Sequence, residues 1–325
     1  MKNCKLPRSV TLPAVAFMLA LSIHAGAAAK DFPTRPVRII VPFGAGGSND
    51  ITTRALASAA EKHLGQPIVT ENITGGGGIV GANRIVAAQP DGYTIGTVVP
   101  SMLMAPYLKK ATYDAREDFT YIIGVMGFAY GVVVRKDAPW DTFADFLADA
   151  RAHPGKFSYG TPGVGTFQQL TMERIAKQQG IKWVSVPFRG DPDAINSLLG
   201  GNIDAVATTT SWAPYVESGD LRLLVTWGTA RATSWPAVPT LKECGVDIVV
   251  IAPYGLAGPK RMDPKVVNIL HDAFRKGMAD PAFTATLARL NEDRFYLGTD
   301  AYRDLLSERL VDWKKMIEEL GVQSD

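Results

Sequence analysis

The chain has 325 residues, of which 46% are hydrophobic and 20% are charged, with 31 glycines, 21 prolines and a formal net charge of +2 at pH 7. This composition excludes an intrinsically disordered chain, a collagen-like repeat and a small disulfide scaffold. The length allows about two domains of roughly 150 residues, each able to bury a substantial core.

Residues 1–29 predict a secretory signal peptide. Basic residues near the start precede an apolar stretch at 10–23, and small residues that suit cleavage follow at 25–29. The apolar stretch is shorter than the ~20 residues that span a bilayer, and an N-terminal anchor helix is the alternative interpretation. Cys4 precedes the apolar stretch, so it is not placed as a lipoprotein cysteine.

The charge balance changes when the signal peptide is removed. Loss of Lys2, Lys5 and Arg8 leaves 31 of the 34 basic residues against 32 acidic ones. A nearly neutral protein argues against nucleic acid or an anionic membrane as the main partner. Cys244 is then the remaining cysteine, so no internal disulfide can form. We therefore expect an exported, soluble, monomeric protein of the periplasm.

The chain after residue 29 begins with alternating strands and helices. The stretch 37–41 is rich in β-branched residues and is bounded by Pro36 and Pro42, which predicts a buried strand. Further strands are expected at 68–72 and 94–99, with helices at 51–64 and 80–88. This alternation predicts a parallel sheet with helices on its faces.

A second alternating run begins near residue 130. Strands are expected at 131–135, 157–159, 184–186, 205–207 and 221–227, and helices at 143–152, 167–179, 193–199, 264–279, 281–290 and 300–320. No low-complexity linker separates the two runs, which favours two lobes joined by crossing strands. We assign 30–128 and 252–325 to one lobe and 129–251 to the other.

Two glycine-rich turns, at 43–50 and 160–166, each join a strand to a capped helix. Glycine lets a ligand approach the backbone, and the first amides of a helix have no partner inside the helix. Together with the helix dipole, these amides favour an anion. Two such turns facing each other across a cleft could hold a carboxylate, and tight chain connections are the alternative interpretation.

Signatures of an enzyme, a metal site or a cofactor site are weak. Residues 76–81 match a GxGxxG pattern, but no acidic residue ends the next strand, so a packing turn is the better interpretation. His63, His153 and His271 lack metal-ligand spacing, and no GxSxG motif occurs. We expect no cofactor, no metal and no catalytic residue.

The segment VPFGAGGSND at 41–50, followed by Arg54, resembles the PFxxGGxxDxxAR opening of the tripartite tricarboxylate transporter receptors, the Bug family of periplasmic solute-binding proteins. The similarity continues in chain order through 90–94, 160–170, 186–190, 198–204 and 238–245. The resemblance implies a two-lobed α/β fold of the Venus-flytrap, type II-like kind, with a mainly parallel sheet flanked by helices in each lobe.

The resemblance also implies a ligand site. In this family, backbone amides of two glycine loops, with bound waters, hold a ligand carboxylate between the lobes. The loops correspond here to 43–50 and 161–166, and other parts of the cleft fall at a strand end, an Arg-Gly turn and 208–212. The implied ligand-binding residues are Phe43, Gly44, Ala45, Gly46, Gly47, Ser48, Asn49, Asp50, Ser101, Thr161, Pro162, Gly163, Gly165, Thr166, Phe167, Arg189, Gly190, Thr209 and Trp212.

Two departures from the family pattern leave the far end of the ligand open. The family often has a histidine after the second loop, where this chain has Gln168-Gln169-Leu170, and Phe167 replaces a small residue or a proline. Aromatic residues facing the cleft would favour a flat or aromatic carboxylate, but each could instead belong to the core. These residues are Phe128, Tyr130, Trp212 and Tyr254.

The sequence thus predicts a periplasmic receptor that captures a di-, tri- or aromatic carboxylate for the membrane permease subunits of a tripartite tricarboxylate transporter. The alternatives are an exported enzyme with Asp50 as its base and a ligand-sensing subunit of a signalling system. Asp50 could instead complement the helix dipole and pair with Arg54. Arg189 could pair with a second ligand carboxylate or with Asp191 or Asp193.

Overall fold

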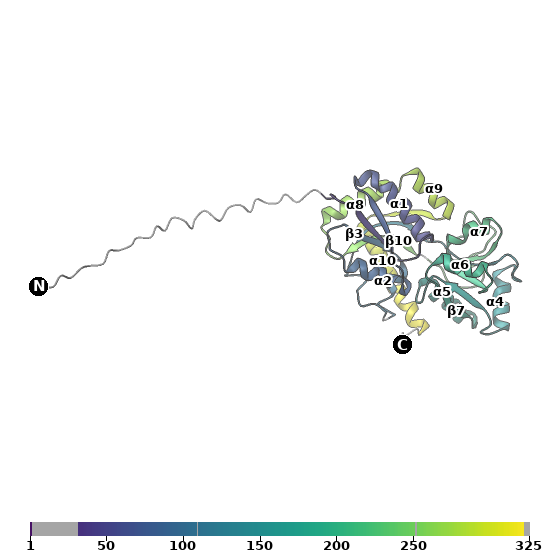
Figure 1. Ribbon diagram of the computed structural model, residues 1–325. Coiled ribbons are helices and arrows are strands. Elements are labelled where there is room, and N and C mark those ends of the chain that lie inside the picture. The colour runs from purple at the N-terminus through teal and green to yellow at the C-terminus, as the bar shows by residue number, and fades with distance from the viewer. Residues whose placement is uncertain (2–31, 109, 251, 322–325) are drawn as a thin grey trace.

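The protein folds into two α/β lobes that lie side by side (Figure 1). The computed structural model describes Met1 and residues 32–108, 110–250 and 252–321. Apart from Met1, the predicted signal peptide lies outside the described residues. One lobe contains a six-stranded sheet and is called the first lobe, and the other contains a five-stranded sheet and is called the second lobe.

The first lobe is built on its six-stranded sheet. In spatial order the strands are β11 (Asp293–Leu297), β4 (Phe119–Gly127), β10 (Pro253–Pro259), β3 (Thr94–Val98), β1 (Val37–Val41) and β2 (Ile68–Asn72). The helical elements are α1 (Ser48–Leu64), η1 (Gly76–Gly78), α2 (Ile79–Val86), α3 (Pro100–Met104), α8 (Pro264–Gly277), α9 (Pro281–Leu290) and α10 (Thr299–Leu320). β1 pairs in parallel with β2 and β3, whereas β10 and β11 pair antiparallel to their neighbours.

The second lobe has the same layered design with fewer strands. In spatial order its strands are β7 (Val184–Pro187), β6 (Ser158–Thr161), β8 (Ala205–Thr209), β5 (Tyr130–Arg135) and β9 (Leu221–Thr226). The helical elements are α4 (Phe143–Ala152), α5 (Phe167–Gln179), α6 (Asp191–Leu199), η2 (Thr210–Trp212) and α7 (Ala213–Glu217). β6 pairs in parallel with β7 and β8, and β5 pairs antiparallel with β8 and β9.

The chain crosses between the lobes from β4 to β5 and returns between β9 and β10. The last helix, α10, also joins them, because the Trp313 ring packs against the Phe167 ring of α5 with 5.8 Å between centroids. Figure 1 shows α10 in yellow, running from the first lobe towards the C-terminus beside the second. Both crossings and α10 therefore hold the lobes next to each other while leaving few covalent connections between them.

The predicted two-lobed α/β fold is confirmed, but both sheets are mixed rather than mainly parallel. The returning strand β10 lies between β3 and β4 and runs antiparallel to both. The strands β4, β10 and β11 are not predicted from the sequence. The β10 segment PYGLAGP has the glycine and proline content of a turn, and its strand conformation depends on neighbours distant in sequence. The lobe limits at 128/129 and 251/252 stay a prediction.

The packing of the first lobe requires apolar side chains in β1 and a glycine in β10. Val37, Ile39, Ile40 and Val41 are fully buried in β1, as in a strand covered on both faces. In β10, a Cβ on Gly255 would lie 2.1 Å from the Ile123 carbonyl oxygen and 2.7 Å from the Tyr302 ring. Because Gly255 has no side chain, Tyr302 of α10 lies directly on the sheet, where its own side chain is fully buried.

We expect Gly255→Ala to lower the free energy of unfolding by about 3 kcal/mol, because the added methyl group overlaps the backbone of β4 and the Tyr302 ring. Gly127→Ala is the matched control in β4, where a Cβ meets nothing within 4 Å. Urea unfolding of both variants measures the difference. Equal free energies of unfolding for the two variants would contradict the packing described for β10.

Candidate functional site

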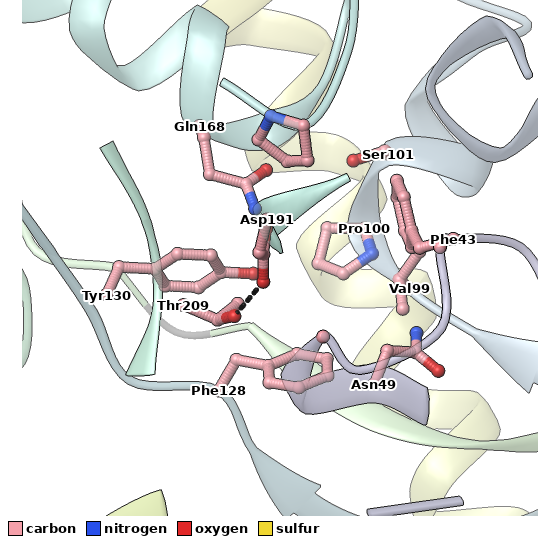
Figure 2. Close-up of a pocket in the computed structure, with 13 residues that line it drawn as sticks. Phe43, Asn49, Val99, Pro100, Ser101, Phe128, Tyr130, Gln168, Asp191 and Thr209 are labelled. Atoms are coloured by element: carbon pink, nitrogen blue, oxygen red, sulfur yellow. Dashed lines mark hydrogen bonds between the residues drawn. The ribbon is translucent and has the colours of Figure 1, made fainter. Parts of the chain in front are cut away.

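A small pocket lies between the lobes and takes residues from both (Figure 2). Its cavity volume is about 20 Å³, enough for about one water molecule. The first lobe contributes the loop after β1 and the starts of α1 and α3, and the second lobe contributes the segment after β6, the end of β8 and the starts of α5 and α6. Phe128 and Tyr130 lie where the chain crosses from β4 to β5. The lining residues are Phe43, Gly44, Gly47, Asn49, Val99, Pro100, Ser101, Phe128, Tyr130, Pro162, Gln168, Asp191 and Thr209.

The loop at 43–50 leads from β1 into α1 and brings the start of that helix to the pocket. Gly47 is the N-cap residue, so no side chain caps α1. The first amides of a helix lack partners inside it, and the helix dipole makes this end electropositive. Gly44, Gly47 and Asn49 line the pocket at this point. The first lobe therefore presents an uncapped helix start to the cleft.

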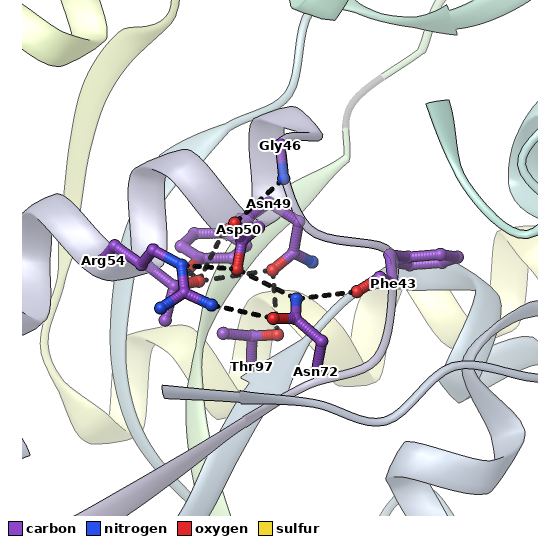
Figure 3. A network of polar contacts seen from close by, with 9 residues as sticks. Phe43, Gly46, Asn49, Asp50, Arg54, Asn72 and Thr97 are labelled. Atoms are coloured by element: carbon purple, nitrogen blue, oxygen red, sulfur yellow. Dashed lines mark hydrogen bonds and ion pairs between the residues drawn. The ribbon is translucent and has the colours of Figure 1, made fainter. Parts of the chain in front are cut away.

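Asp50 holds this loop from behind (Figure 3). Its carboxylate accepts hydrogen bonds from Arg54 Nε (2.9 Å), Asn72 Nδ2 (2.9 Å) and the Gly46 amide (3.0 Å). Burial opposes ionisation of Asp50, but the bonds from Arg54, Gly46 and Asn72 outweigh it, and the pKa lies below its ordinary value. Asp50 is not among the lining residues, so its acceptor positions serve the loop.

Asn49 places a side-chain N–H donor without a partner in the pocket. Its side chain is 6% exposed, and Oδ1 accepts a hydrogen bond from Thr97 Oγ1 at 3.1 Å. This bond turns Nδ2 towards the pocket, as Figure 2 shows. Nδ2 has no hydrogen-bond partner among the described residues. A buried donor without a partner costs free energy, so the site favours an acceptor at this position.

The second glycine turn, at 160–166, is largely bonded within the protein. The Gly165 amide donates to Gln169 Oε1 (2.6 Å), and the Phe167 amide donates to Ser101 Oγ of the first lobe (3.1 Å). Thr166 caps α5 by accepting from the Gln169 amide. From this turn only Pro162 lines the pocket. Ser101 thus reaches the pocket and also links the lobes.

The segment that faces the 43–50 loop is the turn before α6. A Cβ on Gly190 would lie 3.2 Å from the Gly44 nitrogen, and one on Gly44 would lie 3.7 Å from the Arg189 carbonyl oxygen. The hydroxyls of Ser48 and Thr209 are hydrogen-bonded across the same cleft at 3.1 Å. The two lobes therefore meet at 43–50 and 189–191, whereas the 160–166 turn packs against Gly77.

Among the described residues that line the pocket, Asp191 is the one with a carboxylate. It is 8% exposed and accepts hydrogen bonds from the hydroxyls of Thr208, Thr209 and Ser211. Burial raises the pKa of Asp191, and the three hydroxyl bonds oppose that rise. Arg189 is exposed and outside this pocket. Among the described residues, no ion pair joins it to Asp191 or Asp193.

Two of the four aromatic residues that could face the cleft line the pocket, and the other two are core residues. Phe128 and Tyr130 line the pocket together with Phe43. Trp212 is buried in the second lobe, where its Nε1 donates to the Thr208 carbonyl oxygen (3.3 Å). Tyr254 is buried beneath the site, with its hydroxyl 2.6 Å from Thr53 Oγ1. Neither of these two is among the lining residues.

The sequence-predicted site residues separate into two groups. Seven line the pocket: Phe43, Gly44, Gly47, Asn49, Ser101, Pro162 and Thr209. The others do not line it: Ala45, Gly46, Ser48, Asp50, Thr161, Gly163, Gly165, Thr166, Phe167, Arg189, Gly190 and Trp212. Four further lining residues are not predicted from the sequence: Val99, Pro100, Gln168 and Asp191. For Asp191 the available signal was an acid directly after a glycine turn and at a helix start.

Among the described residues, no group of three or more histidine, cysteine, aspartate or glutamate side chains is arranged to hold a metal ion. None of the helices in the described ranges has both the length and the apolar character needed to cross a membrane.

Replacing Asp50 tests its role in holding the loop. We expect Asp50→Asn to lower the free energy of unfolding at pH 7 by about 2 kcal/mol, because an amide cannot accept from all three donors. The folded-state pKa is depressed, so this contribution is present above the unfolded-state pKa of about 3.9 and is lost as the pH falls through the folded-state value.

Urea unfolding of wild type and Asp50→Asn between pH 7 and pH 3 measures this dependence, with the exposed Asp193→Asn as control. The gap between wild type and Asp50→Asn should narrow below about pH 4. A gap that stays constant over this range would show that the Asp50 charge does not stabilise the loop.

Comparisons with known proteins identify the family of this chain. The model of the tripartite tricarboxylate transporter family receptor matches residues 52–322. The chain is 42% identical over 317 residues to the UPF0065 protein in the gbd 5' region of Cupriavidus necator, covering 98% of this chain and 97% of that protein.

Two solved structures are similar over most of their length. The periplasmic binding protein BugD has a TM-score of 0.87 at 27% identity and covers 90% of this chain and 100% of its own. MatC from Rhodopseudomonas palustris, solved with bound malate, has a TM-score of 0.83 at 25% identity and covers 88% of this chain and 100% of its own. The chain therefore belongs to the tripartite tricarboxylate transporter receptor family, the Bug-type solute-binding proteins.

Proposed function

We propose that this protein is a monomeric periplasmic receptor that encloses a small organic carboxylate between its lobes and delivers it to the membrane permease subunits of a tripartite tricarboxylate transporter. The proposal is carried by the unpartnered Asn49 Nδ2, buried in a pocket that both lobes line. Family membership and the malate bound to MatC support it. Export would follow from the signal peptide predicted at 1–29.

The first lobe supplies the groups that suit a carboxylate. Asn49 Nδ2 provides a directed donor, and the uncapped start of α1 provides amides and a positive dipole end beside it. A hydrogen bond to a charged group contributes ~1.5–3 kcal/mol. In our proposal the ligand carboxylate lies in front of α1 and accepts from Asn49.

Ligand entry requires the lobes to separate. A cavity of about 20 Å³ holds about one water molecule, whereas a dicarboxylate is several times larger. Polar contacts that close the cleft include Ser48 with Thr209 and Ser101 with the Phe167 amide. Opening and closing about the crossing strands would admit the ligand and then present the closed form to the permease.

The binding assay is a panel of mono-, di- and tricarboxylates, aromatic carboxylates and amino acids, with the matched amides as controls. Calorimetry and thermal melting of the purified protein are the readouts. A ligand at 100 times its Kd adds about 2.7 kcal/mol to stability. The proposal is wrong if no carboxylate in the panel produces heat or a melting shift.

We expect Asn49→Ala to weaken binding of the best carboxylate by about 10- to 100-fold, because one donor to a charged acceptor is lost. Asn49→Asp should weaken it further, since it keeps the acceptor for Thr97 but replaces the donor by a negative charge. The exposed Asn83→Asp makes the same charge change on α2 and should leave the Kd unchanged. Equal Kd values for all three variants would remove Asn49 from the site.

A further inference from the structure

We propose that the enclosed ligand carries a protonated amine as well as a carboxylate, as an amino acid does, and that Asp191 is the residue that recognises the amine. This inference rests on the proposed function and makes it more specific. It starts from the charge of the pocket. Among the described residues, the pocket lining contains the Asp191 carboxylate and no lysine, arginine or histidine.

A ligand with carboxylates alone would place further negative charge beside Asp191. The pocket has room for about one water molecule, so solvent screens this repulsion poorly. A zwitterion avoids the conflict, because its amine faces Asp191 while its carboxylate faces α1 and Asn49. The two lobes would then recognise opposite ends of one ligand, the first lobe the carboxylate and the second lobe the amine.

The hydrogen bonds around Asp191 fix its position and leave it without a cation. Three hydroxyls donate to it, from Thr208 and Thr209 at the end of β8 and from Ser211 in η2. They turn the carboxylate away from its own helix and towards the cleft, where Oδ2 would lie 3.8 Å from a Cβ on Gly47. Donors of this kind favour the ionised carboxylate. An ammonium group supplies the missing counter-charge.

Other residues around the pocket are compatible with an ammonium group. Tyr130 and Gln168 are buried, and neither side chain forms a hydrogen bond to another described residue. Both can accept from an N–H group. Phe43 and Phe128 add aromatic rings, whose faces attract cations. Figure 2 shows the Tyr130 hydroxyl and the Gln168 amide directed to the same side of the pocket as Asp191.

A neutral Asp191 that donates to a ligand carboxylate is the competing interpretation. Asp191→Asn separates the two, because asparagine imitates the neutral acid in shape and can donate a hydrogen bond. Under our proposal this variant loses the amine site. Under the competing interpretation it keeps the affinity for carboxylates without an amine.

The experiment compares ligand pairs of equal skeleton: aspartate with succinate, glutamate with glutarate, and 4-aminobutyrate with butyrate. In wild type we expect at least one amino acid to bind about 100-fold or more tightly than its deaminated partner. In Asp191→Asn the preference should fall to within about threefold, mainly through loss of amino acid binding. Asp193→Asn, an exposed acid in the first turn of the same helix, should keep the wild-type preference.

Each remaining outcome decides between the claims. If wild type binds a deaminated acid as tightly as its amino acid, the inference about Asp191 is wrong while the carboxylate receptor stands. The same holds if Asp191→Asn keeps the wild-type preference. If no compound with a carboxylate binds, the proposed function itself fails. The wild-type comparison alone tests the inference, so it does not depend on the variant folding.

Discussion

The close approach of two backbones across the cleft is the constraint on which the site depends. A Cβ on Gly77 would lie 2.8 Å from the Val164 carbonyl oxygen, and one on Gly190 would lie 3.2 Å from the Gly44 nitrogen. Because the lobes come this close, the pocket that Asn49 and Asp191 line has a volume of about 20 Å³, enough for about one water molecule. Every polar group that faces the pocket must therefore find its partner in the protein or in the ligand.

The pocket residues without a partner therefore indicate which groups the ligand carries. Asn49 Nδ2 has no acceptor among the described residues, and Asp191 is buried with hydroxyl donors but no cation. A molecule with a carboxylate at one end and an amine at the other would satisfy both. Asp50 does not enter this balance, since Arg54, Asn72 and Gly46 use its oxygens to hold the loop. Asp50, which the sequence suggested as an enzymatic base, therefore serves to hold the loop.

The sequence predicted the two-lobed α/β fold and the glycine loop at 43–50, because periodicity and strand–glycine–helix order are local signals. It did not reveal which turns meet. The turn at 160–166 packs on Gly77, and the turn before α6 faces Gly44 instead. Such pairing depends on how the lobes dock. For the same reason Trp212 and Phe128 could not be told apart, although one is core and the other lines the pocket.

The central claim is that a ligand enters only when the lobes separate and is held when they close. A disulfide between Ser48→Cys and Thr209→Cys, in a Cys244→Ser background, tests it directly, because the native hydroxyls are 3.1 Å apart across the cleft. Calorimetry with the tightest compound of the panel should show no binding to the oxidised protein and a return of binding when the same variant is reduced. Unchanged affinity in the oxidised protein would contradict the account.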